Sequence, residues 1–245
     1  MFIVSSASRP DARPHSLSPV FYSSALPSFL KIRFTDASDL ETVANLFMGN
    51  RKRELDPHNK VRRRSYAELK TPVSEGSAVV AFDEGNDIRF FGMASDHIRY
   101  TGNLSAITEI GGIMSDVKGC RLTQIASAML ALQESVRLRE QYPCLTSHGI
   151  HALVAKDNIG AKKVFGRDLG WEDITCGSRS DTLFNAQGKY DCPDQRAARI
   201  WYAFQDKALV SARDMVSKLL TKHSLTSRDG HTIPVDLDTR VYDII

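Results

Sequence analysis

The chain has 245 residues, of which 42% are hydrophobic and 25% are charged, and its net charge is +3. These values are typical of an ordinary soluble globular protein, and the length suits one large domain with extensions or two small domains. Two classes are disfavoured, because no apolar run approaches the roughly 20 residues of a membrane helix and because dedicated nucleic-acid binders are usually more basic.

The four cysteines lie far apart and include no Cys-x-x-Cys pair; they are Cys120, Cys144, Cys176 and Cys192. This spacing argues against a zinc site or a disulfide framework and favours a reducing compartment, so we expect a cytoplasmic protein. His148 and His151 are the only histidines close to metal-ligand spacing. We interpret them as a loop residue and a strand residue, and we predict no metal site.

The chain is expected to divide into three parts. Residues 1–29 hold eight serines and four prolines but a single acid, Asp11, and they show no periodicity, so we predict a flexible leader. A transit or secretion signal is the alternative interpretation, because such segments are Ser-rich and acid-poor. Residues 30–205 form the predicted main domain, and residues 206–245 form a C-terminal helix and an extended tail.

The first ordered elements are expected directly after the leader. Alternating apolar residues predict a strand at 30–34, and the Thr, Asp and Ser residues that follow are good N-caps for a helix at 39–49. A short second helix is expected near 61–70. Residues 77–82 and 89–97 predict a β-hairpin, because the residues between them are rich in Asp and Gly.

A basic stretch lies between the two expected helices. Residues 51–64 contain seven basic residues and two acids. Three interpretations stay open: a solvated helical face, a patch that neutralises nucleic-acid phosphates, or a surface that selects an acidic substrate.

The second half alternates strands and helices. It is expected to contain a central strand at 107–114, an amphipathic helix at 122–139, a strand at 150–155, a short helix at 159–167, strands near 171–185 and 198–204, a helix at 207–222 and an extended segment at 232–242. The helix at 122–139 is the clearest, because its apolar residues form one stripe. The element order predicts a mixed α/β fold.

Two motifs in this half carry a family resemblance. The apolar strand Glu109-Ile110-Gly111-Gly112-Ile113-Met114 is followed by the basic loop Lys118-Gly119-Cys120-Arg121 and a helix; the pattern Asn158-x-x-Ala161-x-x-Val164-Phe165 then leads to Gly170-Trp171. This combination resembles the GNAT superfamily of N-acetyltransferases, although the spacing to Gly170-Trp171 is one residue longer than usual. The resemblance implies the acyl-CoA N-acyltransferase (GNAT) fold, a mixed central sheet of about seven strands flanked by helices, for residues 30–205.

The resemblance also implies a cofactor site for acetyl-CoA. Anions bind well at a helix N-terminus because its N–H groups lack intrahelical partners, and the loop before the long helix adds Lys118 and Arg121. The implied cofactor contacts are Ile113, Met114, Lys118, Gly119, Cys120, Arg121, Leu122, Thr123, Asn158 and Phe165. The loop departs from the family pattern Gln/Arg-x-x-Gly-x-Gly/Ala, since Arg121 and Thr123 occupy its small positions.

The family's central strand parts from its neighbour to admit the pantetheine arm, so the resemblance implies a gap between 107–114 and 150–155. Gly111 and Gly112 would normally weaken a strand. Close approach of a ligand is one reason to tolerate them, and a bulge or close helix packing is another.

The implied catalytic residue is Glu109, which would accept a proton from the amine substrate. Burial in an apolar strand is expected to raise the pKa of this carboxyl, and the alternative is a solvent-facing or paired strand residue. A backbone N–H near Met114 would stabilise the oxyanion. The family often has a tyrosine as general acid where this chain has Phe165, so either another group serves or the thiolate leaves unaided.

We therefore predict an acyl-CoA-dependent N-acyltransferase that transfers acetyl to a primary amine of a small molecule or protein. Two alternatives stay open: a catalytically degenerate interaction module of the same fold, and a nucleic-acid-associated protein that uses residues 51–64. We expect no membrane partner, we do not favour nucleic acid, and a homodimer is one option for the assembly.

Overall fold

The structure is a computed structural model. It describes residues 26–49, 52, 55–56, 61, 64–95, 105–144, 147–155, 158–174 and 198–245. Nearly all of the expected leader, most of the basic stretch 51–64 and the expected strand beyond residue 174 lie outside the described residues.

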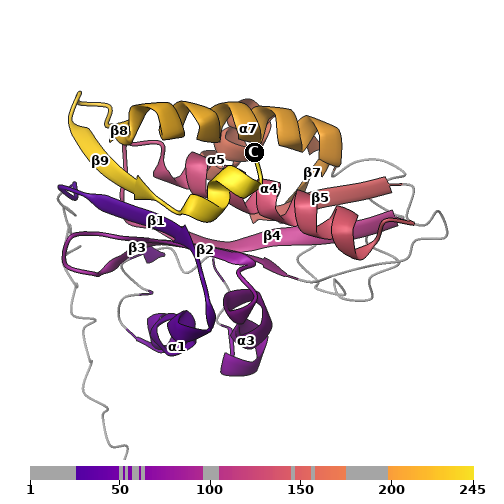
Figure 1. The fold of residues 1–245 in the computed structure, drawn as a ribbon, viewed down its shortest axis with the longest axis horizontal. Coiled ribbons are helices and arrows are strands. Elements are labelled where there is room, and N and C mark those ends of the chain that lie inside the picture. The colour runs from indigo at the N-terminus through magenta and orange to yellow at the C-terminus, as the bar shows by residue number, and fades with distance from the viewer. Residues whose placement is uncertain are drawn as a thin grey trace, which may run out of the picture.

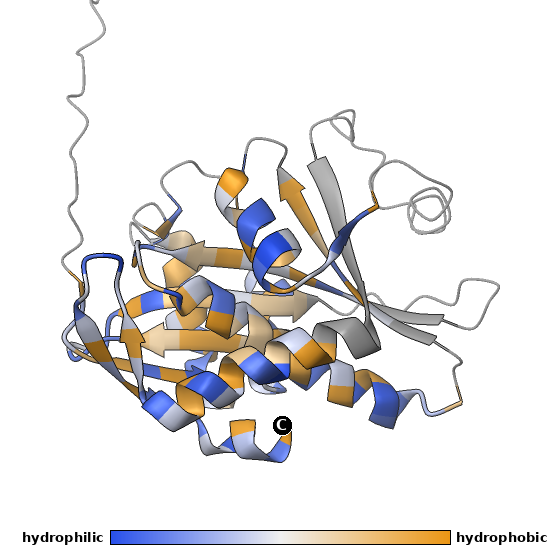
Figure 2. Cartoon of the chain, turned by 90° about the horizontal axis from the view of Figure 1, so that it is seen from above, coloured by the Kyte–Doolittle hydropathy of each residue, from blue (hydrophilic) through white to orange (hydrophobic). Residues whose placement is uncertain are grey.

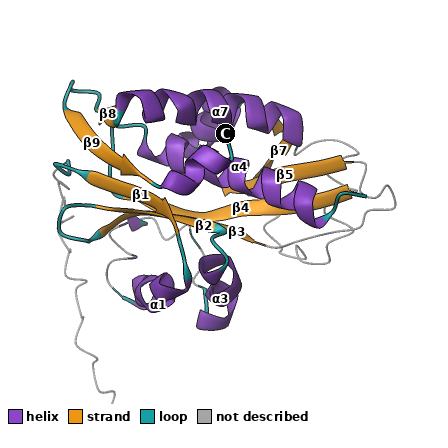
Figure 3. Ribbon diagram, viewed as in Figure 1, coloured by secondary structure: helices purple, strands orange, loops and turns teal. Residues whose placement is uncertain are grey.

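The described residues form a sheet of nine strands in the order β6-β7-β5-β4-β3-β2-β1-β9-β8 (Figure 1; Figure 3). The strands are β1 (Leu30–Phe34), β2 (Ala78–Phe82), β3 (Ile88–Ser95), β4 (Ser105–Ser115), β5 (Ser147–Ala155), β6 (Glu172–Asp173), β7 (Ala198–Phe204), β8 (Ser224–Thr226) and β9 (Thr232–Leu237). The pairs β4–β5 and β1–β9 are parallel and the other pairs are antiparallel. The predicted mixed sheet is confirmed, and the C-terminal strands β8 and β9 add to the seven that were expected.

Helices cover both faces of the sheet. They are α1 (Leu40–Met48), α3 (Tyr66–Ser74), α4 (Leu122–Gln141), α5 (Ile159–Lys162) and α7 (Gln205–Lys222), with 3-10 segments at Ala37–Asp39 and Thr239–Asp243 and a π-helical segment η2 (Lys163–Asp168). Figure 1 shows α1 and α3 on one face of the sheet and α4 and α7 on the other. Orange and blue residues alternate along the covering helices in Figure 2, which is the pattern of amphipathic helices packed on a core.

Two hydrophobic cores result from this layering. The larger lies between the sheet and the α4 and α7 layer, and it includes Leu130 and Ile150. The smaller lies on the α1 and α3 face, and it includes Phe47 and Phe91, whose rings meet edge to face at 5.5 Å. The sheet is therefore buried on both faces, which explains the near-continuous apolar composition of its central strands.

The second helix begins later than its sequence predicted. α3 runs from Tyr66 to Ser74 rather than over 61–70. Ser65 and Glu68 form a reciprocal capping box, in which each side chain accepts a hydrogen bond from the other residue's backbone N–H. This pair satisfies two donors at the helix start and so determines where the helix begins.

The short helix expected at 159–167 changes type along its length. α5 ends at Lys162, and the chain continues as π-helical residues, with Leu169 N–H bonded to the Val164 carbonyl at 2.9 Å. A π-turn takes in one more residue than an α-turn because its hydrogen bond reaches the fifth residue back. This turn accommodates the extra residue before Gly170 and Trp171.

The C-terminal segment is less extended than expected. β8 was not anticipated, and residues 239–243 form a 3-10 helix rather than continuing β9. The Asp238 carboxylate accepts from the Phe34 N–H at 2.9 Å, and Arg240 Nη2 donates to the Phe34 carbonyl at 2.6 Å. These bonds turn the chain back onto the end of β1, so the pairing of β9 stops at Leu237.

Candidate active site

The strands β4 and β5 part at a defined rung. Their ladder runs from Ser105 opposite Ser147 to Glu109 opposite His151. Beyond that rung the pairing partners of β4 lie on β3, and those of β5 lie on β7. The predicted gap is therefore present, and two strand edges face it from residue 110 on one side and residue 152 on the other.

The strand β4 also carries a bulge just beyond this rung. Phe91 pairs with Met114 but Met93 pairs with Gly111, so β4 holds one residue more than β3 over this stretch. Gly112 has a φ of +63°, in the left-handed region that favours glycine. A bulge bends its strand and re-aims the following residues, so Gly112 directs the last part of β4 away from β5.

Gly111 has a separate reason to lack a side chain. A Cβ atom built there would lie 3.3 Å from Oε1 of Glu109. The Glu109 carboxylate therefore lies over the backbone of Gly111, on the same face of β4.

Glu109 points to the α1 and α3 face of the sheet. The preceding residue, Thr108, points the opposite way, with Oγ1 3.5 Å from Glu134 Oε2 on α4, and strand side chains alternate between faces. Glu109 is 8% exposed, and its Oε2 lies 3.7 Å from Nε2 of His151, which is 4% exposed. The structure thus places the predicted base in a buried position, at the rung where the strands part.

Sequence reasoning missed the contact between His151 and Glu109. It assigned His148 to a loop, but β5 begins at Ser147 and pairs with β4 from its first residue, so both histidines lie in the strand. No local pattern marks His151, because the contact joins residues 42 positions apart through the parallel register. Only the pairing of β4 with β5 reveals it.

The loop after β4 presents cations beside a helix N-terminus. Lys118, Gly119 and Arg121 are exposed, whereas Leu122 is fully buried. Helix α4 has no side-chain cap at Arg121 and no acid in its first turn. Its first N–H groups therefore keep the positive end of the helix dipole without a competing carboxylate, which suits an anion.

The thiol of Cys120 lies within this loop. Burial raises its pKa, and this effect exceeds the opposing hydrogen bonds to the N–H groups of Leu122 and of Cys120 itself. The sulfur therefore stays protonated at neutral pH, and Cys120 is poorly suited to act as a nucleophile.

The turn between β8 and β9 lies against the same loop. The Arg228 N–H donates to the Gly119 carbonyl at 2.7 Å. Arg228 is exposed and adds a third cation near Lys118 and Arg121. The sequence gives no signal for this contact, because the two segments are 109 positions apart and meet only through the pairing of β9 with β1.

The second motif forms a cap and a buried aromatic pair. Asn158 Oδ1 accepts from the Ala161 N–H at 3.0 Å and so caps α5, which leaves its amide nitrogen to donate elsewhere. Phe165 is 3% exposed, and its ring centroid lies 4.8 Å from that of Trp171. Phe165 therefore packs in the core, and its ring is not presented to the surface.

Two of the predicted contacts lie on the bulged end of β4. Ile113 is partly exposed, whereas Met114 is buried in the core of the α1 and α3 face. Thr123, in the first turn of α4, is partly exposed. The side chain of its neighbour Gln124 donates to Asp168 at 3.3 Å, which connects the start of α4 with the segment that follows Asn158.

The described part of the basic stretch is engaged in ion pairs. Lys52 is 4% exposed and lies 3.3 Å from Asp56, and Arg64 lies 3.9 Å from Glu68. These two cations are therefore partly neutralised, and the nucleic-acid alternative depends on residues outside the described part of the chain.

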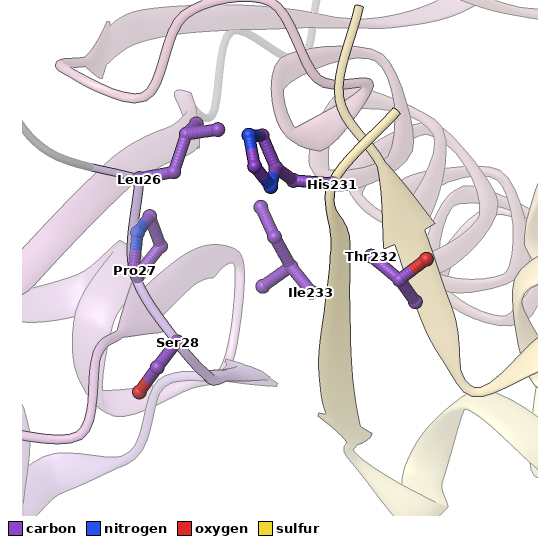
Figure 4. Close-up of a pocket in the computed structure, with 6 residues that line it drawn as sticks. All are labelled: Leu26, Pro27, Ser28, His231, Thr232 and Ile233. Atoms are coloured by element: carbon purple, nitrogen blue, oxygen red, sulfur yellow. The ribbon is translucent and has the colours of Figure 1, made fainter. Parts of the chain in front are cut away.

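A shallow hollow of about 390 Å³ lies elsewhere, between residues 26–28 and residues 231–233 (Figure 4). None of the predicted site residues lines it. In the part of the chain that the structure describes, no group of three or more His, Cys, Asp or Glu residues is arranged to hold a metal ion. Over the same residues, no helix combines the length and hydropathy needed to cross a membrane.

No family model matches this chain, and no curated protein matches it. Among solved structures, a GNAT-family acetyltransferase from Staphylococcus aureus Mu50 is 14% identical, with a TM-score of 0.48 over 72% of this chain and 99% of that one. Ribosomal-protein-S5-alanine acetyltransferase from Vibrio fischeri is 17% identical, with a TM-score of 0.44 over 71% and 92%. Spermidine N-acetyltransferase from Vibrio cholerae, in complex with CoA and spermine, is 19% identical, with a TM-score of 0.41 over 74% and 99%. All three TM-scores lie below 0.5, so these similarities carry no functional conclusion. The proposed function depends on the site geometry described above.

Proposed function

We propose that this protein is an acyl-CoA-dependent N-acyltransferase that transfers the acetyl group of acetyl-CoA to a primary amine of a small molecule or protein. One observation carries the proposal. The strands β4 and β5 part directly after Glu109, and β4 then leads into a basic loop at a helix N-terminus whose N-cap residue, Arg121, makes no side-chain cap. A gap between strands, a buried carboxylate and an anion-receiving loop thus follow one another within about fifteen residues.

The residues at this site fit an extended ligand that carries phosphates. The facing edges of β4 and β5 would hold the pantetheine amides in the manner of an added strand. Lys118, Arg121 and the first N–H groups of α4 would hold the pyrophosphate. Acetyl-CoA would supply an acetyl group activated as a thioester. The protein would have to bind it, accept the amine's proton and stabilise the oxyanion.

The chain's own residues then have two tasks. Glu109 accepts a proton from the ammonium form of the acceptor, because only the neutral amine is a nucleophile. A backbone N–H near Met114 remains the predicted donor to the developing oxyanion. The buried Phe165 has no proton to give, so we expect the leaving thiolate, whose free thiol has a pKa of about 8.5, to depart without help from that position.

A catalytically degenerate binding module is the second candidate. Two observations favour it: Phe165 stands where the resemblance implies a tyrosine, and Arg121 stands where it implies a glycine. Such a module would lack acyl transfer and could lack the cofactor altogether.

One experiment separates the two candidates. The purified protein is examined by native mass spectrometry for co-bound coenzyme A, then titrated with acetyl-CoA in a calorimeter, then assayed for thiol release with a panel of amines. Binding together with amine-dependent thiol release supports the enzyme. No heat of binding at high micromolar acetyl-CoA would reject it and favour the module.

We place the protein in the cytoplasm because its cysteine spacing suits a reducing compartment. Cys120 and Cys144 are free thiols, which is compatible with that proposal. Fractionation of cells that express the full chain is the direct test.

A further inference from the structure

His151 occupies a special position relative to Glu109. The two residues face each other in the last rung before β4 and β5 part. Their side chains lie on the same face of the sheet, with Nε2 of His151 and Oε2 of Glu109 3.7 Å apart. Each side chain is at least nine-tenths buried, so water gives little stabilisation to a charge on either one.

The two imidazole nitrogens have different surroundings. Nε2 faces the carboxylate, whereas Nδ1 is buried and has no hydrogen-bond partner among the residues that the structure describes. A neutral imidazole carries one proton, and an N–H buried without an acceptor is costly. The proton therefore belongs on Nε2, where it points toward the negative charge of Glu109.

A metal-binding role or a purely structural role suits this histidine less well. Among the described residues no cluster could hold a metal ion together with it. A purely structural histidine in a core would be expected to satisfy both ring nitrogens. Among the described residues His151 satisfies neither, since its Nδ1 has no partner and 3.7 Å from Nε2 to Glu109 is beyond hydrogen-bond distance. Catalytic hydrogen bonds are often long before the substrate binds and shorten in the complex.

We propose that His151 is the positioning partner of Glu109: its Nε2–H holds the buried carboxylate at the parting of β4 and β5 and stabilises the ionised form that accepts the amine's proton. This inference rests on the proposed function. In the step concerned, one N–H bond of the acceptor ammonium breaks and an O–H bond forms on Glu109. His151 keeps its own proton throughout, so the pair gains the one proton that the amine loses.

Kinetics of four variants test this role. His151→Leu replaces the N–H donor with an apolar side chain of similar bulk. It should lower kcat about 10- to 100-fold, while the KM for acetyl-CoA changes less than about twofold. His151→Gln keeps an N–H donor at a similar reach and should recover most of the lost kcat. In the Glu109→Gln background, adding His151→Leu should lower kcat less than about twofold further. A residue that acts only through the Glu109 carboxylate has no effect once that carboxylate is absent.

His223→Asn is the matched control, since this exposed histidine has a φ of 49°, which asparagine tolerates, and it lies at the end of α7. Its kinetics should equal those of the wild type. Equal losses for Leu and Gln at position 151, or a full additional loss in the Glu109→Gln background, would overturn the positioning role. Thermal unfolding of each variant separates misfolding from a catalytic loss.

A spectroscopic arm does not depend on activity. Nitrogen NMR of ¹⁵N-histidine-labelled protein reports which ring nitrogen carries the proton. We expect His151 to be protonated on Nε2 in the wild type and this preference to weaken in Glu109→Gln. Unchanged signals in that variant would overturn the pairing itself. A wild type that neither binds acetyl-CoA nor transfers acetyl would instead overturn the proposed function, and the catalytic role of His151 with it.

Discussion

At the scale of single residues, the last part of β4 contains one residue with a chemical role and two glycines that shape the backbone around it. Glu109 supplies a carboxylate, Gly111 leaves room for it, and Gly112 turns the backbone away from β5. Each glycine is therefore needed for a different physical reason: Gly111 for the space that the carboxylate occupies, and Gly112 for its positive φ. Substituting either glycine should disturb the backbone, whereas substituting Glu109 should remove the chemical group.

Glu109→Gln keeps the shape of the side chain but cannot accept a proton from an ammonium group. We expect kcat for amine acetylation to fall about 10²- to 10⁴-fold, the range typical of a lost general base. Acetyl-CoA affinity, measured by calorimetry, should stay within about threefold. The control is Glu41→Gln on the exposed face of α1, and activity retained in Glu109→Gln would remove Glu109 as the base.

Gly112→Ala places a side chain at a positive φ, close to Met93 Cγ at 3.4 Å. The left-handed conformation alone costs roughly 1–2 kcal/mol of unfolding free energy, which urea denaturation measures. Gly76→Ala is the matched control, because Gly76 at the end of α3 has a φ of +75° and its added Cβ would also lie 3.4 Å from its nearest neighbour, the Thr35 carbonyl oxygen. Both should lose stability, but only Gly112→Ala should also weaken acetyl-CoA binding. Equal acetyl-CoA affinity in the two variants would show that the bulge at Gly112 does not contribute to cofactor binding.

At the scale of elements, the start of α4 is the part of the site with the most accessible charge. Lys118 and Arg121 flank an N-terminus without a side-chain cap, and the turn after β8 adds Arg228. The small residues of the family pattern are absent here, so charge has to contribute more of the anion binding than close backbone approach.

Lys118→Ala and Arg121→Ala should each weaken acetyl-CoA binding about 10- to 150-fold, since a hydrogen bond to a charged group contributes about 1.5–3 kcal/mol. Calorimetry at two salt concentrations should also give a smaller salt dependence than the wild type, because fewer cations meet the phosphates. Lys70→Ala in α3 removes an exposed lysine on the opposite face of the sheet and is the control. If all three variants bind alike, the phosphates lie elsewhere.

At the scale of the whole molecule, the C-terminal segment belongs to the same sheet and core as the rest. α7 packs against α4, and β9 pairs with β1. The hydrogen bonds of Asp238 and Arg240 to Phe34 then close the chain onto β1. The contact of Arg228 with Gly119 depends on this closure, so the C-terminal segment supports the loop that we assign to the cofactor.

Asp238 makes this closure sensitive to acid. Burial alone would raise its pKa, but the hydrogen bonds from the Arg240 side chain and from the N–H groups of Arg240 and Phe34 outweigh burial and hold the pKa below its usual value. A depressed pKa in the folded state stabilises the protein above the pKa of the unfolded chain, about 3.9, and the contribution disappears as the pH falls below it.

Asp238→Asn should therefore lower the free energy of unfolding by about 1–3 kcal/mol at pH 7, and the difference from the wild type should shrink below about pH 4. Urea denaturation at both pH values measures it. Asp236→Asn, at an exposed position on β9, is the control and should change little at either pH. A difference that persists at low pH would show that the Asp238 carboxylate is not responsible.

Local sequence patterns predicted the mixed α/β class and the strand, loop and helix from Glu109 to Arg139, and the residue types of the loop predicted the cations at the helix start, because these depend on neighbours along the chain. These patterns did not determine which strand lies beside which. The rung at which β4 and β5 part, the His151 opposite Glu109, the Arg228 against Gly119 and the addition of β8 and β9 were decided only by the tertiary structure. Each joins residues far apart in sequence, and the packing of the sheet and its helices, rather than any local pattern, brings them together.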